Sequence, residues 1–113
     1  MPEGSQYLEF PHICYVKAEL YLQKGDYTTA ADFYNQYLHS FKGKNFVKDA
    51  YYKLSLCYWL NNDTQQAIWY FNQVPQKGQA VYDTDKQAAK VASTGVLPNK
   101  SLMKIRLLTD GGY

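Results

Sequence analysis

Apolar residues recur at helical spacing along most of this chain, interrupted by short polar turns. The first stretch, over about residues 11–24, carries apolar side chains three and four positions apart: Ile13, Val16, Leu20 and Tyr21. Because residues at these intervals share one face of a helix, the pattern predicts an α-helix. Gly25 is suited to end it in the left-handed conformation, and Asp26 is suited to cap a second helix. The sequence therefore predicts a pair of helices over 11–40.

The same plan returns at a constant interval. Ala30 and Ala67 are 37 residues apart, and so are Gly25 and Asn62. Asparagine is the usual substitute for glycine in a left-handed cap, and Asp63 follows it as a cap for the next helix. A fixed period of this size is typical of stacked helical units. We expect a second unit over 46–75, after a loop at 41–45.

A third unit begins near the end of the chain. Residues 98–113 match only the first helix of the pattern. A short inserted helix over 84–94, stopped by Gly95, accounts for the longer spacing before it. The apolar residues of the 98–113 helix would then lack a covering helix. The uncovered apolar residues favour a fragment of a longer repeat protein over a dimer in which a second copy covers the same face.

These residues resemble the tetratricopeptide repeat, whose signature is W-x₂-L-G-x₂-Y…A-x₃-F…P over about 34 residues. The second unit matches it through Tyr51, Leu54, Ser55, Tyr58, Ala67 and Phe71. The first unit matches through Cys14, Ala18, Tyr21, Ala30 and Tyr34, whereas Lys17 replaces the usual leucine and the final proline is missing. The last 30 residues or so are also similar to those of uncharacterised bacterial repeat proteins.

The resemblance implies an all-α superhelix of antiparallel helix pairs, whose first helices line a concave groove for a peptide or a partner helix. Carried over, the groove residues of the two complete units are His12, Tyr15, Glu19, Leu22, Gln23, Asp49, Tyr52, Leu56 and Trp59. The partial third unit would add Ser101, Ile105 and Leu108. The family's clamp for C-terminal carboxylates uses lysine and asparagine at the positions of Tyr15 and Glu19, so we expect an aromatic, weakly polar groove instead. Large aromatic residues serve helix packing equally well, and both roles stay open here.

The composition changes this picture little. The 113 residues include 12 basic and 10 acidic side chains, for a net charge of +2, whereas a nucleic-acid-binding domain more often has a concentrated basic stripe. No apolar run approaches the ~20 residues that span a membrane. Residues 1–6 lack the charged-then-apolar plan of a signal peptide. We therefore expect a soluble protein of unknown compartment that neither binds nucleic acid nor inserts into a membrane.

Few residues suggest chemistry of their own. Cys14 and Cys57 stand at core-type positions, where thiols usually behave as small apolar groups. His12 and His39 lie on different predicted helices, without a third ligand at metal-binding spacing. No glycine-rich phosphate loop, catalytic carboxylate pair or Ser-His-Asp set can be assembled. We expect no enzymatic activity, no cofactor and no metal.

A protein-interaction module is the predicted function, with a peptide or helix of a partner protein held in the groove. Two alternatives stay open. One is a structural or oligomerisation scaffold, including a homodimer through the 98–113 helix. The other is a part of a larger envelope-located or enzyme complex.

Overall fold

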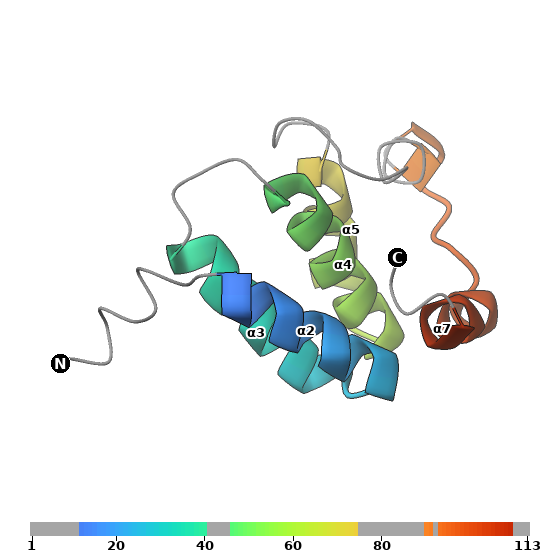
Figure 1. The fold of residues 1–113 in the computed structure, drawn as a ribbon. Coiled ribbons are helices and arrows are strands. Elements are labelled where there is room, and N and C mark those ends of the chain that lie inside the picture. The colour runs from blue at the N-terminus through green and yellow to red at the C-terminus, as the bar shows by residue number, and fades with distance from the viewer. Residues whose placement is uncertain (1–11, 41–45, 75–89, 92, 110–113) are drawn as a thin grey trace, which may run out of the picture.

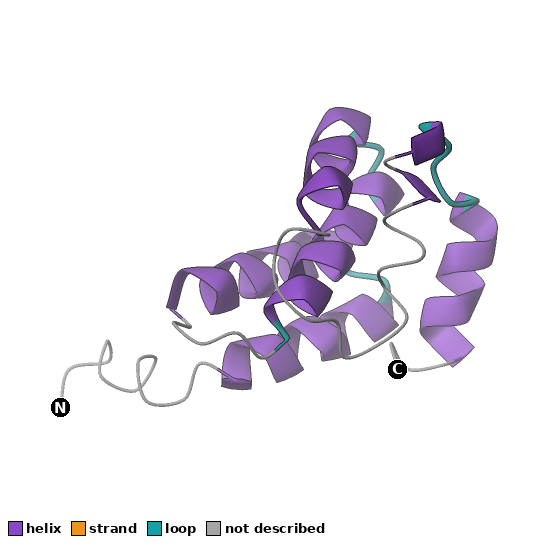
Figure 2. Ribbon diagram, turned by 90° about the horizontal axis from the view of Figure 1, so that it is seen from above, coloured by secondary structure: helices purple, strands orange, loops and turns teal. Residues whose placement is uncertain are grey.

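The computed structural model describes residues 12–40, 46–74, 90–91 and 93–109. Over these residues the elements are α2 (His12–Lys24), α3 (Tyr27–Ser40), α4 (Val47–Leu60), α5 (Thr64–Gln73) and α7 (Lys100–Thr109) (Figure 1). Helices and loops make up this part of the chain, and no strand occurs in it (Figure 2). The prediction of an all-α fold is confirmed.

The turn between α2 and α3 has the predicted chemistry. Gly25 takes a φ of +83°, in the left-handed region that glycine enters without a steric penalty. The carboxylate of Asp26 accepts a hydrogen bond from the backbone N–H of Thr29 over 3.2 Å. It thereby satisfies one of the donors that the first turn of α3 leaves without a helical partner.

The turn between α4 and α5 repeats that geometry with a different residue. Asn62 takes a φ of +66°, and Asp63 accepts a hydrogen bond from the backbone N–H of Gln66 over 3.4 Å. Asparagine tolerates the left-handed conformation better than most residues that carry a side chain. Asn62 therefore gives the second unit the same backbone turn between its two helices that Gly25 gives the first.

The four helices α2 to α5 pack in chain order, with α3 in contact with both α2 and α4. Ala18, Ala30 and Ala67 are fully buried where these helices pack. Small side chains at such positions allow helix axes to approach to about 8–10 Å. Larger rings fill the space beside them, since Tyr34, Tyr37 and Phe71 are also fully buried.

The spacing that predicted α2 does not mark its buried face. Ile13, Val16 and Leu20 are 50–55% exposed. The side of α2 that packs against the other helices carries instead Cys14, Tyr15, Ala18, Glu19 and Leu22. The helix has apolar residues on two faces, and only one of them is covered, so spacing alone could not identify the buried one.

Helix α7 lies beside the ends of α2 and α4 (Figure 1) and contacts both helices. Its first turn is capped by Asn99, whose side-chain oxygen accepts the backbone N–H of Leu102 over 3.0 Å. Met103 and Leu107 are its buried apolar residues. The helix begins at Lys100, and residues 110–113 of the expected third unit lie outside the described residues.

A short helical stretch precedes α7. Residues 90, 91, 93 and 94 are helical, and Gly95 follows with a φ of +70°. The backbone N–H of Gly95 donates to the carbonyl of Val91 over 2.8 Å, as expected for a helix that ends at this glycine. The earlier part of the inserted helix expected over 84–94, and the loop at 41–45, lie outside the described residues.

Candidate partner-binding surface

The nine residues predicted to line the groove come from α2 and α4, the first helices of the two units. We call them the α2–α4 surface. Six of them are buried in this structure: Tyr15, Glu19, Leu22, Asp49, Tyr52 and Leu56. Gln23 and Trp59 are half-buried, and His12 is exposed. Most of the predicted surface is therefore packed against other parts of the chain, and Trp59 is the residue among its tyrosines and tryptophan that stays partly accessible.

A buried ion pair links the two helices of this surface. The ammonium of Lys53 on α4 lies 2.7 and 2.9 Å from the two carboxylate oxygens of Glu19 on α2, and both side chains are only 5% exposed. The hydroxyl of Tyr34 on α3 donates to the same carboxylate. The Lys53 ammonium also lies 5.7 Å from the ring centroid of Tyr15. Three helices thus meet at one compensated pair of charges.

Burial shapes the chemistry of the phenol in this cluster. Removal from water, and then the negative charge of Glu19, raises the pKa of Tyr34 well above its usual range. The phenol therefore keeps its proton and can donate it in a hydrogen bond to Glu19. The polar atoms of Glu19 and Lys53 are thus directed inward, toward the neighbouring helices.

Sequence reasoning placed Glu19 in the groove and did not select Lys53. A signal was nevertheless present in the sequence. Lys53 stands alone in the mostly apolar run of 50–60, and Glu19 is the single acidic residue of α2. Isolated charges inside apolar helices are typically buried as pairs, because an unpaired buried charge is very costly. Two such charges of opposite sign predict a contact between their helices.

The two thiols are buried and free. Burial raises the pKa of the Cys57 thiol far above its usual range, and the charge of Glu19 adds to this effect. Burial also raises the pKa of Cys14. Since the thiolate is the reactive form of cysteine, neither environment activates its thiol as a nucleophile.

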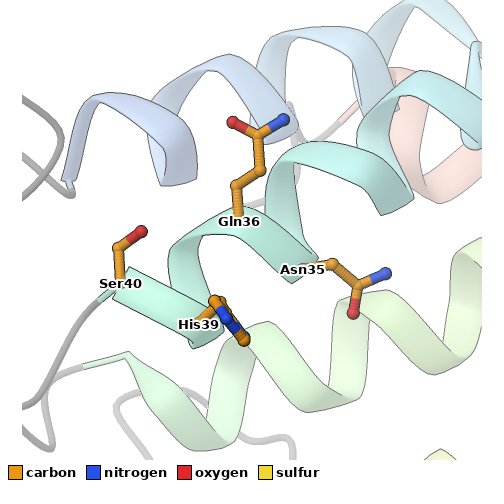
Figure 3. Close-up of a pocket in the computed structure, with 4 residues that line it drawn as sticks. All are labelled: Asn35, Gln36, His39 and Ser40. Carbon is orange, nitrogen blue, oxygen red and sulfur yellow. The ribbon is translucent and has the colours of Figure 1, made fainter. Parts of the chain in front are cut away.

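A separate open hollow lies along α3, lined by Asn35, Gln36, His39 and Ser40 (Figure 3). All four side chains come from one helix, and two of them bridge to neighbours. Asn35 donates to the hydroxyl of Tyr58 over 3.5 Å, and Gln36 accepts from the thiol of Cys14 over 3.9 Å. The hollow brings no group of metal ligands together, and the described residues as a whole contain none.

The accessible part of the α2–α4 surface is engaged by the segment that leads into α7. The indole N–H of Trp59 donates to the backbone carbonyl of Pro98 over 2.6 Å. The ammonium of Lys100 lies 4.3 Å from the centroid of the Trp59 ring, within the range of a cation–π interaction, and it also donates to the side-chain oxygen of Asn62. Trp59 thus offers a hydrogen-bond donor at its edge and a negative ring face for a cation.

The residues expected from the partial third unit lie elsewhere. Ser101, Ile105 and Leu108 are all exposed, because α7 turns Met103 and Leu107 inward. On α5, Trp69 is 53% exposed, and its ring meets the ring of Tyr70 edge-on at 4.9 Å. The chain therefore has one tryptophan at the α2–α4 surface and one on α5.

None of the helices described is long and apolar enough to cross a membrane.

The family model for the tetratricopeptide repeat matches the chain twice, over residues 7–45 and over residues 15–81. No curated protein and no solved structure matches this chain. The two family matches together span residues 7–81, which is more than half of the chain, and this range includes both helix pairs, α2–α3 and α4–α5. The chain belongs to the tetratricopeptide repeat family.

Proposed function

We propose that this protein is an interaction module that binds a peptide or helix of a partner protein on the α2–α4 surface. Tetratricopeptide repeats are in general protein-interaction modules and are typically non-catalytic. The observation that carries the proposal is the contact of α7 with both α2 and α4, because it indicates that these helices can accept a further helix from outside their own pairs. A partner helix would use the same kind of contact.

The chemistry around Trp59 supports a peptide ligand. Its indole N–H suits a backbone carbonyl, and its ring face suits a lysine or arginine side chain. Both contacts are made within this chain, by Pro98 and Lys100. Tryptophan residues that combine a large apolar area with a polar edge are common among the residues that dominate binding energy at protein interfaces.

Site-specific cross-linking tests the proposal. The photoreactive residue p-benzoylphenylalanine is placed at Trp59 in one variant and at Trp69, the exposed tryptophan of α5, in the control. Both variants are irradiated in a lysate after their helicity has been checked. The proposal predicts adducts to another protein from position 59 that are absent from position 69. Adducts from position 69 alone, or the same adducts from both positions, would place binding elsewhere.

Self-association is a second candidate function, favoured by large apolar side chains on the surface. Leu102 and Leu108 of α7 are 66% and 62% exposed, and Val16 of α2 is 55% exposed. A homodimer through α7 would bury the first two. Light scattering at increasing protein concentration should then show a dimer that is lost in the variant Leu102→Glu, Leu108→Glu. A monomer at all concentrations would remove this candidate.

A further inference from the structure

Helix α7 does not extend the stack in the way a repeat would. Each unit of a helical repeat contacts its neighbours, so a third first-helix should pack on the second pair, α4 and α5. Helix α7 instead reaches back to α2, a helix of the first pair, while it also contacts α4. Figure 1 shows it beside the ends of these two helices. It therefore lies where the α2–α4 surface would receive a ligand.

The contacts of α7 follow a narrow stripe. Among residues 100–108, the buried side chains are Met103 and Leu107, four positions apart. Lys100 precedes Met103 by one helical turn and contacts Trp59 and Asn62. A stripe of anchors at such intervals is typical of a peptide helix bound in a groove. The large apolar residues Leu102, Ile105 and Leu108 stay exposed, as they would on the outer face of a bound helix.

The inner side of this stripe joins the apolar core of the module. Met103 and Leu107 belong to the same cluster of buried residues as Leu22 and Leu56, which are each 1% exposed. Leu22 and Leu56 are members of the α2–α4 surface, one from each helix. A helix with apolar residues at the positions of Met103 and Leu107 could join this cluster in the same way.

We propose that α7 is an internal ligand of the α2–α4 surface, and that the partner is a helix of the same pattern which replaces it. This inference rests on the proposed function. The pattern is a lysine or arginine, followed by large apolar residues three and seven positions later, as in Lys100, Met103 and Leu107. A backbone carbonyl just before the helix completes the set, because Trp59 binds the carbonyl of Pro98.

The proposal makes α7 a competitor of the partner. An intramolecular competitor lowers the apparent affinity of an external ligand by the fraction of molecules in which the site is open. If α7 covers the surface in nine molecules of ten, the external helix binds about tenfold more weakly than to the open surface. Weakening the contact of α7 with the α2–α4 surface should therefore raise the affinity of this surface for an external helix.

A synthetic peptide of residues 96–109 serves as the external helix. The full chain carries Trp69→Phe, so that Trp59 is its one remaining tryptophan. Adding Met103→Asp and Leu107→Asp should release α7, shift the emission of Trp59 to longer wavelength, and tighten binding of the peptide by about tenfold. The matched control, Leu102→Asp with Leu108→Asp, changes the exposed side of the same helix and should alter neither quantity.

A peptide with both anchors replaced by aspartate should not bind. Lys100→Gln provides a second variant that leaves the apolar core intact, and it should shift the Trp59 emission and tighten peptide binding in the same direction. Equal affinity of the peptide for parent and variants, or an unchanged emission of Trp59, would overturn the proposal. If cross-links from position 59 to another protein persist in that case, the proposed function stands and only the role of α7 is lost.

Discussion

The buried pair of Glu19 and Lys53 offers the sharpest test of how the two helix pairs are joined. The variant Lys53→Met removes the ammonium and keeps a side chain of similar length and volume. It leaves the Glu19 carboxylate buried, with the hydroxyl of Tyr34 as the hydrogen bond that remains from this cluster. The substitution therefore leaves the charge of Glu19 unpaired among three helices and creates no large cavity.

The expected loss follows from the burial of the pair. An exposed ion pair contributes about 0–1 kcal/mol, but here both side chains are 5% exposed and the closest oxygen lies 2.7 Å from the ammonium. Removing one partner of a buried pair typically costs about 3–5 kcal/mol, because the other charge is left uncompensated. Domains have a total stability of about 5–15 kcal/mol. Lys53→Met should therefore remove a large part of the stability of this protein.

Urea unfolding followed by circular dichroism measures this loss. The triple variant Glu19→Leu, Lys53→Met, Tyr34→Phe removes both charges and also the buried hydroxyl that would otherwise lose its acceptor. It should recover most of the stability, since apolar replacement of a buried pair and its hydrogen-bond partner is often neutral or stabilising. Lys104→Met, at an exposed position of α7, is the control and should change the free energy of unfolding by no more than about 0.5 kcal/mol. A loss below about 1 kcal/mol for Lys53→Met, or no recovery in the triple variant, would show that the buried pair does not stabilise the contact of these three helices.

Three further predictions concern packing, backbone and pH. Ala30→Leu should cost about 1–3 kcal/mol in the free energy of unfolding, because Ala30 is fully buried at the helix contact; an unchanged melting curve would contradict this. Gly25→Ala should cost about 1–2 kcal/mol through the left-handed backbone alone, since an added Cβ would meet no atom closer than 4.0 Å. Gly25→Asn should cost less, because Asn62 takes the same left-handed conformation, and equal losses for both variants would contradict this expectation. Burial raises the pKa of Cys57 and of Tyr34 above the values of 9.0 and 10.0 that these groups have in the unfolded chain. The stability of the fold is therefore unaffected by their ionisation below these pH values and decreases as pH rises above them, because the unfolded chain loses its protons first. Urea unfolding at pH 7 and pH 10.5 should show this decrease, smaller in Cys57→Ala, and a stability that is constant or rises over this interval would count against it.

The features that could be predicted from the sequence are local ones. The left-handed residues Gly25 and Asn62 and the caps Asp26 and Asp63 act within one turn of the chain. Their effect depends on backbone geometry and on neighbours three residues away, and both can be read from sequence spacing. The repetition of the two turns at one interval then predicted the order of the helices. For the same reason, the family resemblance agrees with the structure.

The features that could not be predicted depend on contacts between distant residues. Glu19 and Lys53 are 34 positions apart, and their pairing requires the relative placement of α2, α3 and α4. The buried face of α2 was ambiguous because the helix has apolar residues on two sides, and Ile13 lies on the exposed one. The position of α7 depends on the course of the chain after α5, where the repeat pattern is interrupted. Spacing predicted this helix but not its contacts with α2 and α4.

The two tryptophans allow the most direct test of where a partner binds. In a ¹⁵N-labelled sample each indole N–H gives its own signal, and Trp59 and Trp69 report on the α2–α4 surface and on α5, respectively. The protein that cross-links from position 59 is added to the labelled chain in increasing amounts. We expect the signal of Trp59 to move, because a partner helix must replace the carbonyl of Pro98 as its acceptor, while the signal of Trp69 stays in place. Movement of the Trp69 signal with an unchanged Trp59 would contradict binding at the α2–α4 surface.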